Sequence, residues 1–162
     1  TVHYGGGQPA YAPLADTVRM PMPDRFHTTQ DYAATVLHEL AHASGHQSRL
    51  NRLNLYARFG SEEYAREELR AELASALLGA QLGVPMASSM MESHASYLAN
   101  WLTVLKRDKN EIFRAAADAQ KIADYLGQWA IGPTAQSEQH ASHTAATESH
   151  QAESTVAARM RR

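Results

Sequence analysis

The chain has 162 residues, of which 44% are hydrophobic, and a formal net charge of −2. This length and apolar content suit one globular domain with room for a tail, and the near-neutral charge argues against a molecule built to cover nucleic acid or an anionic membrane. The chain has no cysteine, which excludes disulfides, thiolate metal ligands and a cysteine nucleophile and fits a cytoplasmic protein.

No membrane or targeting segment is evident. No stretch approaches the ~20 apolar residues that a membrane span needs, so we expect no membrane partner. The first residue is Thr1 rather than Met, so the chain is treated as a potential fragment and the absence of a signal peptide has little weight.

The first 28 residues contain four of the six prolines and three consecutive glycines at 5–7. Between them, Tyr11 and the segment 17–20 carry β-favouring residues that predict one or two short strands. Pro21 and Pro23 lack backbone donors, so we expect this strand to lie at a sheet edge. Such an edge can pair with an extended substrate peptide.

Two helical patterns follow. The first covers about 29–44, with Gly45 as its stop. The second runs from about Ser61, a plausible N-cap, to Leu82, and ends at Gly83. The apolar residues of the first pattern share one helix face and lie at positions 33, 36, 37, 40, 41 and 44.

Two further helices and a tail complete the predicted order. The third helix covers about 92–106. The fourth starts at a capping box, Asp108-Lys109-Asn110-Glu111, and ends near Gly127. Residues 131–162 are rich in Ala, Ser, Thr, Gln and His and have no aromatic residue, so they cannot bury enough apolar surface to offset the entropy of ordering. We therefore predict a domain over 1–130 and a flexible tail or linker over 131–162.

The first helix carries an HExxH motif, formed by His38, Glu39 and His42. Residues four apart lie on one helix face, so both imidazoles can bind one Zn²⁺. Glu39 follows the first ligand directly and can reach a water at the metal without binding the metal itself. Its predicted role is that of the catalytic general base.

A catalytic zinc also needs a third protein ligand, and His46 is the less favoured candidate. The run from His38 to Gly45 begins like a metzincin motif, but that class places its third histidine three residues after the glycine. Ser48 occupies that position here, and His46 comes too early. Its alternative interpretation is a polar residue in the turn.

The second helix offers a better third ligand in Glu68 or Glu72. These two acids share a small, polar face with Ser75 and Gly79, which would let the helix approach the first one closely. One acid can bind the metal, while the other accepts the N–H of a ligating histidine. The remaining acids of this stretch are interpreted as solvated: Glu62, Glu63 and Glu67.

We favour Glu68 as the ligand because the pattern Glu68-x-x-Ala71-Glu72 resembles the ExxA(D/N) helix of many glutamate-zincins. In that helix the first acid binds the metal, and the residue four positions later supports it. A glutamate stands here in the second position, so Glu72 remains the alternative ligand.

Peptide hydrolysis also needs a second electrophile for the oxyanion, and three residues are candidates. Tyr97 lies on the apolar side of the third predicted helix, which is equally the position of a core residue. His94 lies one turn earlier and can be a turn residue instead. Tyr64 is the third candidate, on the second helix.

Longer stretches resemble the zincin-like metallopeptidase domain of ArdC-type antirestriction proteins. The same domain occurs in TraC-type primases of conjugative plasmids and in phage polyvalent proteins. The resemblance covers about 1–127, in the order of the family. It rests on "YAPLADTVRMP", "HELAHASGHQSRLNR", "ARFGSEEYAREELRAELASALLG" and "SYLANWLTVLKRDKNEIFRAAADAQKIADYL".

The resemblance implies a zinc-dependent peptidase fold carried on mobile DNA. It carries over His38 and His42 as ligands, Glu39 as catalytic acid/base, and one acid of the second helix as third ligand. In the family a separate N-terminal domain binds single-stranded DNA, and nothing in this chain matches it. Single-stranded DNA is therefore a partner only through a neighbouring domain that this chain lacks.

The sequence thus predicts a small α+β zincin with a short N-terminal sheet edge and a mainly helical body around one Zn²⁺. The predicted function is hydrolysis of a protein or peptide substrate, linked to antirestriction or conjugation in the bacterial cytoplasm of a host or recipient cell. The alternative is a DNA-associated accessory module with a structural, non-catalytic zinc. In that case Arg49, Arg52 and Arg58 would meet phosphates rather than line a solvated loop.

Overall fold

The computed structural model describes residues 1–53, 57–84 and 99–130. Its contacts divide the chain into two units, residues 1–127 and 128–162. The sheet and the helices that carry the predicted metal ligands belong to the first unit. The predicted tail over 131–162 lies outside the described residues, so the tail and the boundary at 130 stay predictions.

The N-terminal segment forms a three-stranded mixed sheet in the order β1-β3-β2. Strand β3 (Thr17–Met20) lies in the centre, parallel to β1 (Val2–Tyr4) and antiparallel to β2 (Ala10–Ala12). The expectation that the strand near 17–20 lies at an edge was therefore wrong. The prolines follow the end of β3, so they remove no hydrogen bond from it, and Pro23 opens a short 3₁₀ turn, Pro23–Arg25.

The two long helices begin and end at the predicted residues. Helix α1 covers Thr29–Ser44, and the Thr28 side chain accepts a hydrogen bond from the Asp31 N–H at 3.0 Å. Helix α2 covers Glu62–Leu82, and Ser61 caps the Tyr64 N–H at 3.2 Å. At the end of α2, Gly83 adopts φ 69°, a left-handed conformation that favours glycine. These bounds are confirmed.

The C-terminal helices agree with the prediction less closely. Only part of the predicted third helix is described, and that part, 99–107, is helical. Helix α4 covers Glu111–Ala130 and continues through Gly127. Its predicted capping box does not form, because the Asp108 carboxylate accepts from the Asn110 N–H at 3.0 Å. The Glu111 carboxylate accepts instead from Arg114.

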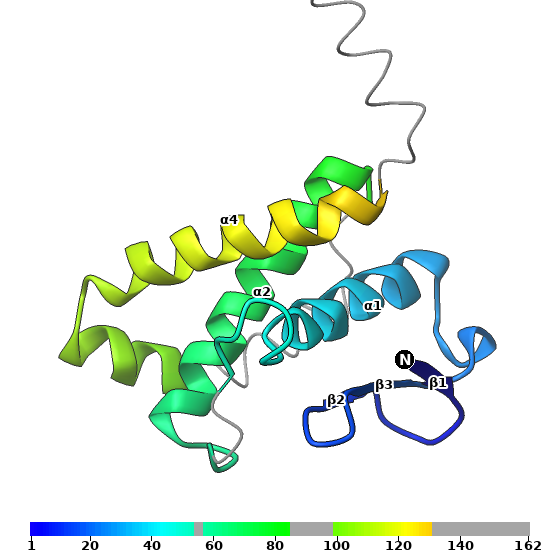
Figure 1. Ribbon diagram of the computed structural model, residues 1–162, viewed down its shortest axis with the longest axis horizontal. Coiled ribbons are helices and arrows are strands. Elements are labelled where there is room, and N and C mark those ends of the chain that lie inside the picture. The colour runs from blue at the N-terminus through cyan, green and yellow to red at the C-terminus, as the bar shows by residue number, and fades with distance from the viewer. Residues whose placement is uncertain (54–56, 85–98, 131–162) are drawn as a thin grey trace, which may run out of the picture. The chain divides into compact units, whose positions relative to one another are not determined.

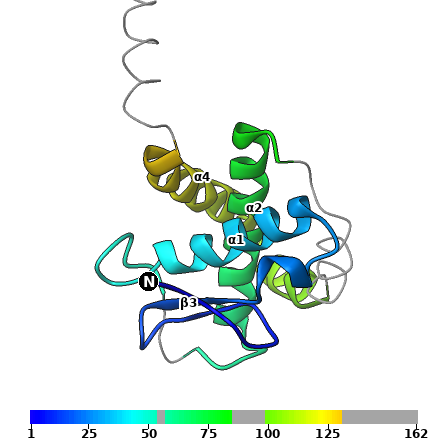
Figure 2. The ribbon, with the colours of Figure 1, turned by 90° about the vertical axis from the view of Figure 1, so that its right-hand side faces the viewer.

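Helix α1 lies between the sheet and α2, as the two perpendicular views show (Figures 1 and 2). The contact with α2 is made by small residues: Ala41 and Ala71 are fully buried in one cluster. Small side chains allow the two helix backbones to approach closely, which brings the polar residues on either side of the alanines within reach of each other. The same cluster contains Ala74, Ala119 and Ile122, with Leu50, Leu73 and Leu126 against it.

None of the described helices combines the length and the apolar character that crossing a membrane requires.

Candidate metal centre

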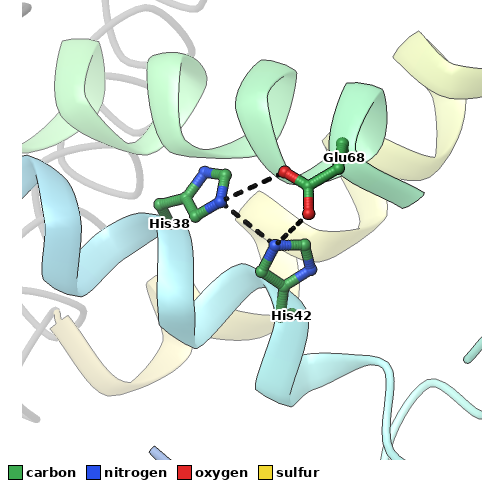
Figure 3. A group of neighbouring side chains, drawn as sticks. All are labelled: His38, His42 and Glu68. Carbon is green, nitrogen blue, oxygen red and sulfur yellow. Dashed lines mark hydrogen bonds and ion pairs between the residues drawn. The ribbon is translucent and has the colours of Figure 1, made fainter. Parts of the chain in front are cut away.

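Two histidines of α1 and one glutamate of α2 point toward a common centre (Figure 3). The Nε2 atoms of His38 and His42 lie 3.1 Å apart. The Glu68 carboxylate faces both rings, with Oε2 3.6 Å from His38 Nε2 and Oε1 3.6 Å from His42 Nε2. One ligand atom from each of the three residues lies within 4.8 Å of the others. The histidines converge because they are one helical turn apart, and Glu68 joins them through the alanine contact between α1 and α2.

The chemistry of these donors fits a divalent metal. Two imidazole nitrogens and one carboxylate form the His₂Glu set of catalytic zinc sites, which leave a further position open for water. The three residues also line a cavity of about 570 Å³. A cavity of this size has room for water and part of a substrate, whereas a structural metal would be enclosed by four protein ligands.

Glu67 holds the second ring nitrogen of His42. Its Oε1 lies 3.0 Å from His42 Nδ1. Burial disfavours the charged imidazolium, but the Glu67 contact and the nearby carboxylates outweigh burial and raise the pKa of His42. An acceptor on Nδ1 leaves Nε2 free to act as the metal-binding atom. The interpretation of Glu67 as a solvated residue was therefore wrong.

Arg52 in turn fixes Glu67. Its Nε and Nη2 donate to the two Glu67 oxygens at 3.1 and 2.8 Å, and its Nη1 donates to Ser44 Oγ at 2.8 Å. Nη2 also donates to the Ala41 carbonyl. Gly45 makes room for this side chain, since a Cβ there would lie 3.0 Å from Arg52 Cζ and 2.7 Å from Leu53 Cγ.

Glu72 takes the corresponding place beside His38. Its Oε1 lies 3.6 Å from His38 Nδ1, on the side of the ring opposite to Glu68. The two histidines are thus flanked by different acids, and the contact to His42 is the shorter one. This arrangement places Glu68 at the Nε2 atoms and Glu72 at the outer nitrogen of His38.

Glu39 is buried, with 6% of its surface exposed, and lines the cavity beside the two histidines. Burial raises the pKa of its carboxyl, the charge of Glu68 adds to the increase, and His42 and a hydrogen bond from the Tyr11 backbone oppose it. A raised pKa makes the carboxylate a stronger base at neutral pH.

The Tyr11 backbone belongs to a strand edge that borders the cavity. Tyr11 in β2 lies opposite Val18 in β3, and Val18 donates its own N–H to Thr1 on the far side. Because the N–H and C=O of a residue in an antiparallel pair point the same way, those of Tyr11 point to the outer edge. Among the described residues no strand lies beyond this edge.

Comparison with known proteins identifies the family of this chain. A profile of the zincin-like metallopeptidase family MPTase-PolyVal matches residues 1–118. The chain belongs to this family.

The sequence relatives of this zincin-like domain include two DNA primases TraC of Escherichia coli. The chain is 40% identical to one over 127 residues and 45% identical to the other over 124. These matches cover 78% and 76% of the chain but only 12% and 8% of the primases. A protein of Sinorhizobium fredii (strain NBRC 101917 / NGR234), y4eC, is 43% identical over 125 residues, with 77% of the chain and 40% of y4eC covered.

Solved structures of the antirestriction protein ArdC from plasmid R388 share the fold. The Mn(II)-bound crystal structure has a TM-score of 0.72 and 38% identity, and covers 78% of the chain and 46% of ArdC. The metal-free structure has a TM-score of 0.67. These matches confirm the predicted family and the small α+β zincin-like fold, while the chain spans less than half of each of these relatives.

The other predicted site residues of the zincin-like domain have separate places. His46 lies in the turn after α1, where its Nδ1 is 2.8 Å from Ser48 Oγ, and it does not join the His38 group. Tyr64 lines the cavity, with its ring 4.9 Å from that of Phe59. Tyr97 and His94 lie outside the described residues, so their predicted roles stay predictions.

Sequence reasoning missed Glu67 and Arg52 as supports of His42. Glu67 lies next to Glu68, a third of a turn around α2. Because its neighbours are also acidic, it was interpreted as part of a solvated acidic stretch. One signal was available: a carboxylate is a common partner for the outer nitrogen of a metal-binding histidine, so each acid near the ligand could have been tested for that role.

Proposed function

We propose that this domain is a metal-dependent peptidase that uses zinc to hydrolyse peptide bonds of a protein or peptide substrate. The observation that carries the proposal is the position of His38, His42 and Glu68 in the wall of an open cavity, with the buried base Glu39 beside them. The Mn(II) bound to the relative ArdC supports a divalent ion, and the His₂Glu donor set favours zinc.

The residues of the site have separate roles in the proposed hydrolysis. When bound, zinc would act as a Lewis acid and make a coordinated water more acidic. Glu39 accepts a proton from the attacking water and delivers it to the leaving amine. His38, His42 and Glu68 hold the ion, while Glu67 and Glu72 orient the two rings.

The outer edge of β2 is suited to an extended peptide. A substrate whose N–H pairs with the Tyr11 C=O would lie along the cavity wall beside Glu39. Backbone pairing accepts many sequences, so this surface favours an unfolded or extended segment rather than one particular side chain. Tyr64 in the same wall remains a candidate for contact with the oxyanion.

The relatives point to a setting on mobile DNA. ArdC is an antirestriction protein of plasmid R388, and we propose that this domain acts in antirestriction or conjugative transfer, in the cytoplasm of a host or recipient cell. Contact with single-stranded DNA would come from a neighbouring domain of a longer protein.

The alternative, a DNA-associated module with a structural zinc, has less support. Two of the three arginines that would meet phosphates are bonded within the domain: Arg49 to Asp16 and Arg52 to Glu67. Arg58 remains exposed. The open cavity beside the ligands also differs from the closed coordination of structural zinc.

The test is Glu39→Gln, which keeps the size and polarity of the side chain but removes its basicity. We expect zinc content to stay at about one per chain and turnover of labelled casein to fall by ~10²–10⁴, the typical contribution of general-base catalysis. Asp124→Asn, the same chemical change at an exposed position of α4, serves as the control. Cleavage by Glu39→Gln at the parental rate would refute the proposed hydrolysis.

A further inference from the structure

Arg49 joins the turn between β2 and β3 to the end of α1. Its Nη1 donates to Asp16 Oδ2 at 3.1 Å, and Nη2 donates to Asp16 Oδ1. Its Nε donates to the Ala43 carbonyl in the last turn of α1 at 2.7 Å. One planar guanidinium therefore bonds the hairpin and the helix at the same time.

Tyr11 completes this contact from the strand. Its hydroxyl donates to Asp16 Oδ1 at 2.8 Å and accepts from Arg49 Nη2 at 3.2 Å. Burial and the Asp16 carboxylate raise the pKa of Tyr11 to about 12, so the phenol keeps the proton that it donates. We call the set Arg49, Asp16 and Tyr11 the clip.

Tyr11, a member of the clip, lies beside the catalytic base Glu39. The Tyr11 ring is fixed by the clip, while Tyr11 and Glu39 line the same cavity at the outer edge of β2. Glu39 and the metal-binding histidines belong to α1, the helix to which Arg49 is bonded. Arg49, which lies outside the cavity wall, therefore links the strand edge to the catalytic helix.

We propose that Arg49 is a positioning residue that holds the β2 edge in register with Glu39, so that a peptide paired to the edge presents its backbone to the metal. This inference rests on the proposed peptidase function, because it assigns the β2 edge to substrate. It predicts an effect on peptide binding that is separate from metal binding and from folding.

Two conservative variants test the clip. Arg49→Lys keeps the charge but cannot bond Asp16 and Ala43 with one planar group. Tyr11→Phe keeps the ring and removes only the hydroxyl. Arg114→Lys is the matched control, since Arg114 bonds two carboxylates, Asp108 and Glu111, at the start of α4.

Binding and cleavage are measured separately, with fluorescein-labelled β-casein as an unfolded chain. In a Glu39→Gln background, we expect both clip variants to weaken casein binding roughly three- to tenfold, the effect of losing one or two hydrogen bonds. In the active background KM should rise by a similar factor, with kcat within about twofold and zinc content unchanged. Arg114→Lys should match the parent in all of these, and its melting temperature controls for lost stability.

Each result decides between the hypotheses. Parental binding by Arg49→Lys and Tyr11→Phe would overturn the proposal, as would a loss of zinc in both or an equal loss of binding in Arg114→Lys. Failure of the metal-loaded parent to bind casein would overturn it as well. If the parent binds casein but cleaves nothing, the peptidase function fails, while weaker binding by the clip variants still supports the role of Arg49.

Discussion

Helix α2 carries charged side chains on two of its sides, and the two sides face different partners. Toward α1, Glu68 and Glu72 face the imidazole rings of His38 and His42. Toward α4, Arg70 of α2 faces the carboxylates of Glu111 and Asp118. The first side lines the histidine group, and the second is a network of ion pairs.

On the α4 side, the acids are paired with arginines. Arg70 Nη2 lies 2.8 Å from Glu111 Oε1, and Arg70 Nε lies 2.9 Å from Asp118 Oδ2. Arg114 adds a contact of 2.8 Å to Glu111 Oε2. A guanidinium is always charged, so these acids have permanent counter-ions and no need of a metal.

An imidazole differs because it is neutral as a metal ligand. Carboxylates that face two neutral rings are compensated fully only when a cation joins them. The comparison teaches that the type of base beside a buried acid, more than the burial of the acid, separates a metal-binding cluster from a structural one.

The largest expected effect is loss of the metal from the α1 side. His38→Ala, His42→Ala or Glu68→Gln should each remove most of the bound zinc, because the remaining ligands hold it poorly. His46→Ala should keep it, since His46 bonds Ser48 in the turn. Elemental analysis after dialysis measures the effect. If Glu72→Gln loses zinc and Glu68→Gln keeps it, the two acids have been assigned the wrong way round.

A smaller effect is expected at the acid that supports His42. Glu67→Gln should weaken zinc binding ~10–100-fold, as is typical when the partner of a metal-binding histidine is changed. Competition with a chelator measures the affinity. Glu63→Gln, one turn earlier and exposed, is the matched control. Equal affinities of the two variants would show that Glu67 does not orient His42.

The α4 side should respond in stability alone. Arg70→Met removes the counter-ion of Glu111 and Asp118 and should lower the free energy of unfolding by ~1.5–3 kcal/mol, the range for hydrogen bonds to charged groups. Zinc affinity should stay at the parental value. Urea unfolding and chelator competition on the same sample test both statements. A loss of zinc affinity would show that the α4 side of α2 also supports metal binding.

The pH dependence of that variant follows from the same network. Burial opposes ionisation of Glu111 and Asp118, but the arginine contacts outweigh it and lower both pKa values. A lowered pKa stabilises the fold at pH values above the pKa of the unfolded state. That stabilisation is lost as the pH falls through the pKa of the folded state. Arg70→Met should therefore lose less stability on acidification than the parent does.

The sequence predicted those features that depend on neighbours along the chain. The Ser61 cap and the stops at Gly45 and Gly83 mark helix ends, and a four-residue spacing brings His38 and His42 together. Helix caps and helical spacing depend only on residues close together in the chain, so the sequence alone is enough to predict them.

Features that depend on packing between distant segments were predicted less well. β1 was missed because three exposed residues show no apolar alternation, and its partner β3 lies some 16 residues later in the register Val2–Val18. The faces of α2 offered two candidate ligands, but only the packing of α1 against α2, with Ala41 and Ala71 in one buried cluster, places Glu68 at the Nε2 atoms. The roles of Glu67 and Arg52 need the path of the loop after α1, which no periodicity describes.

Gly45 shows how far a metal site can extend from its ligands. Its backbone, with φ −78°, is open to any residue, so the demand for glycine here comes from space. A single methyl group would push against Arg52, which holds Glu67 and through it His42. In a mutational scan that sorts variants by zinc retention, Gly45 should therefore score like a member of the site, although it offers no side-chain atom to the ion.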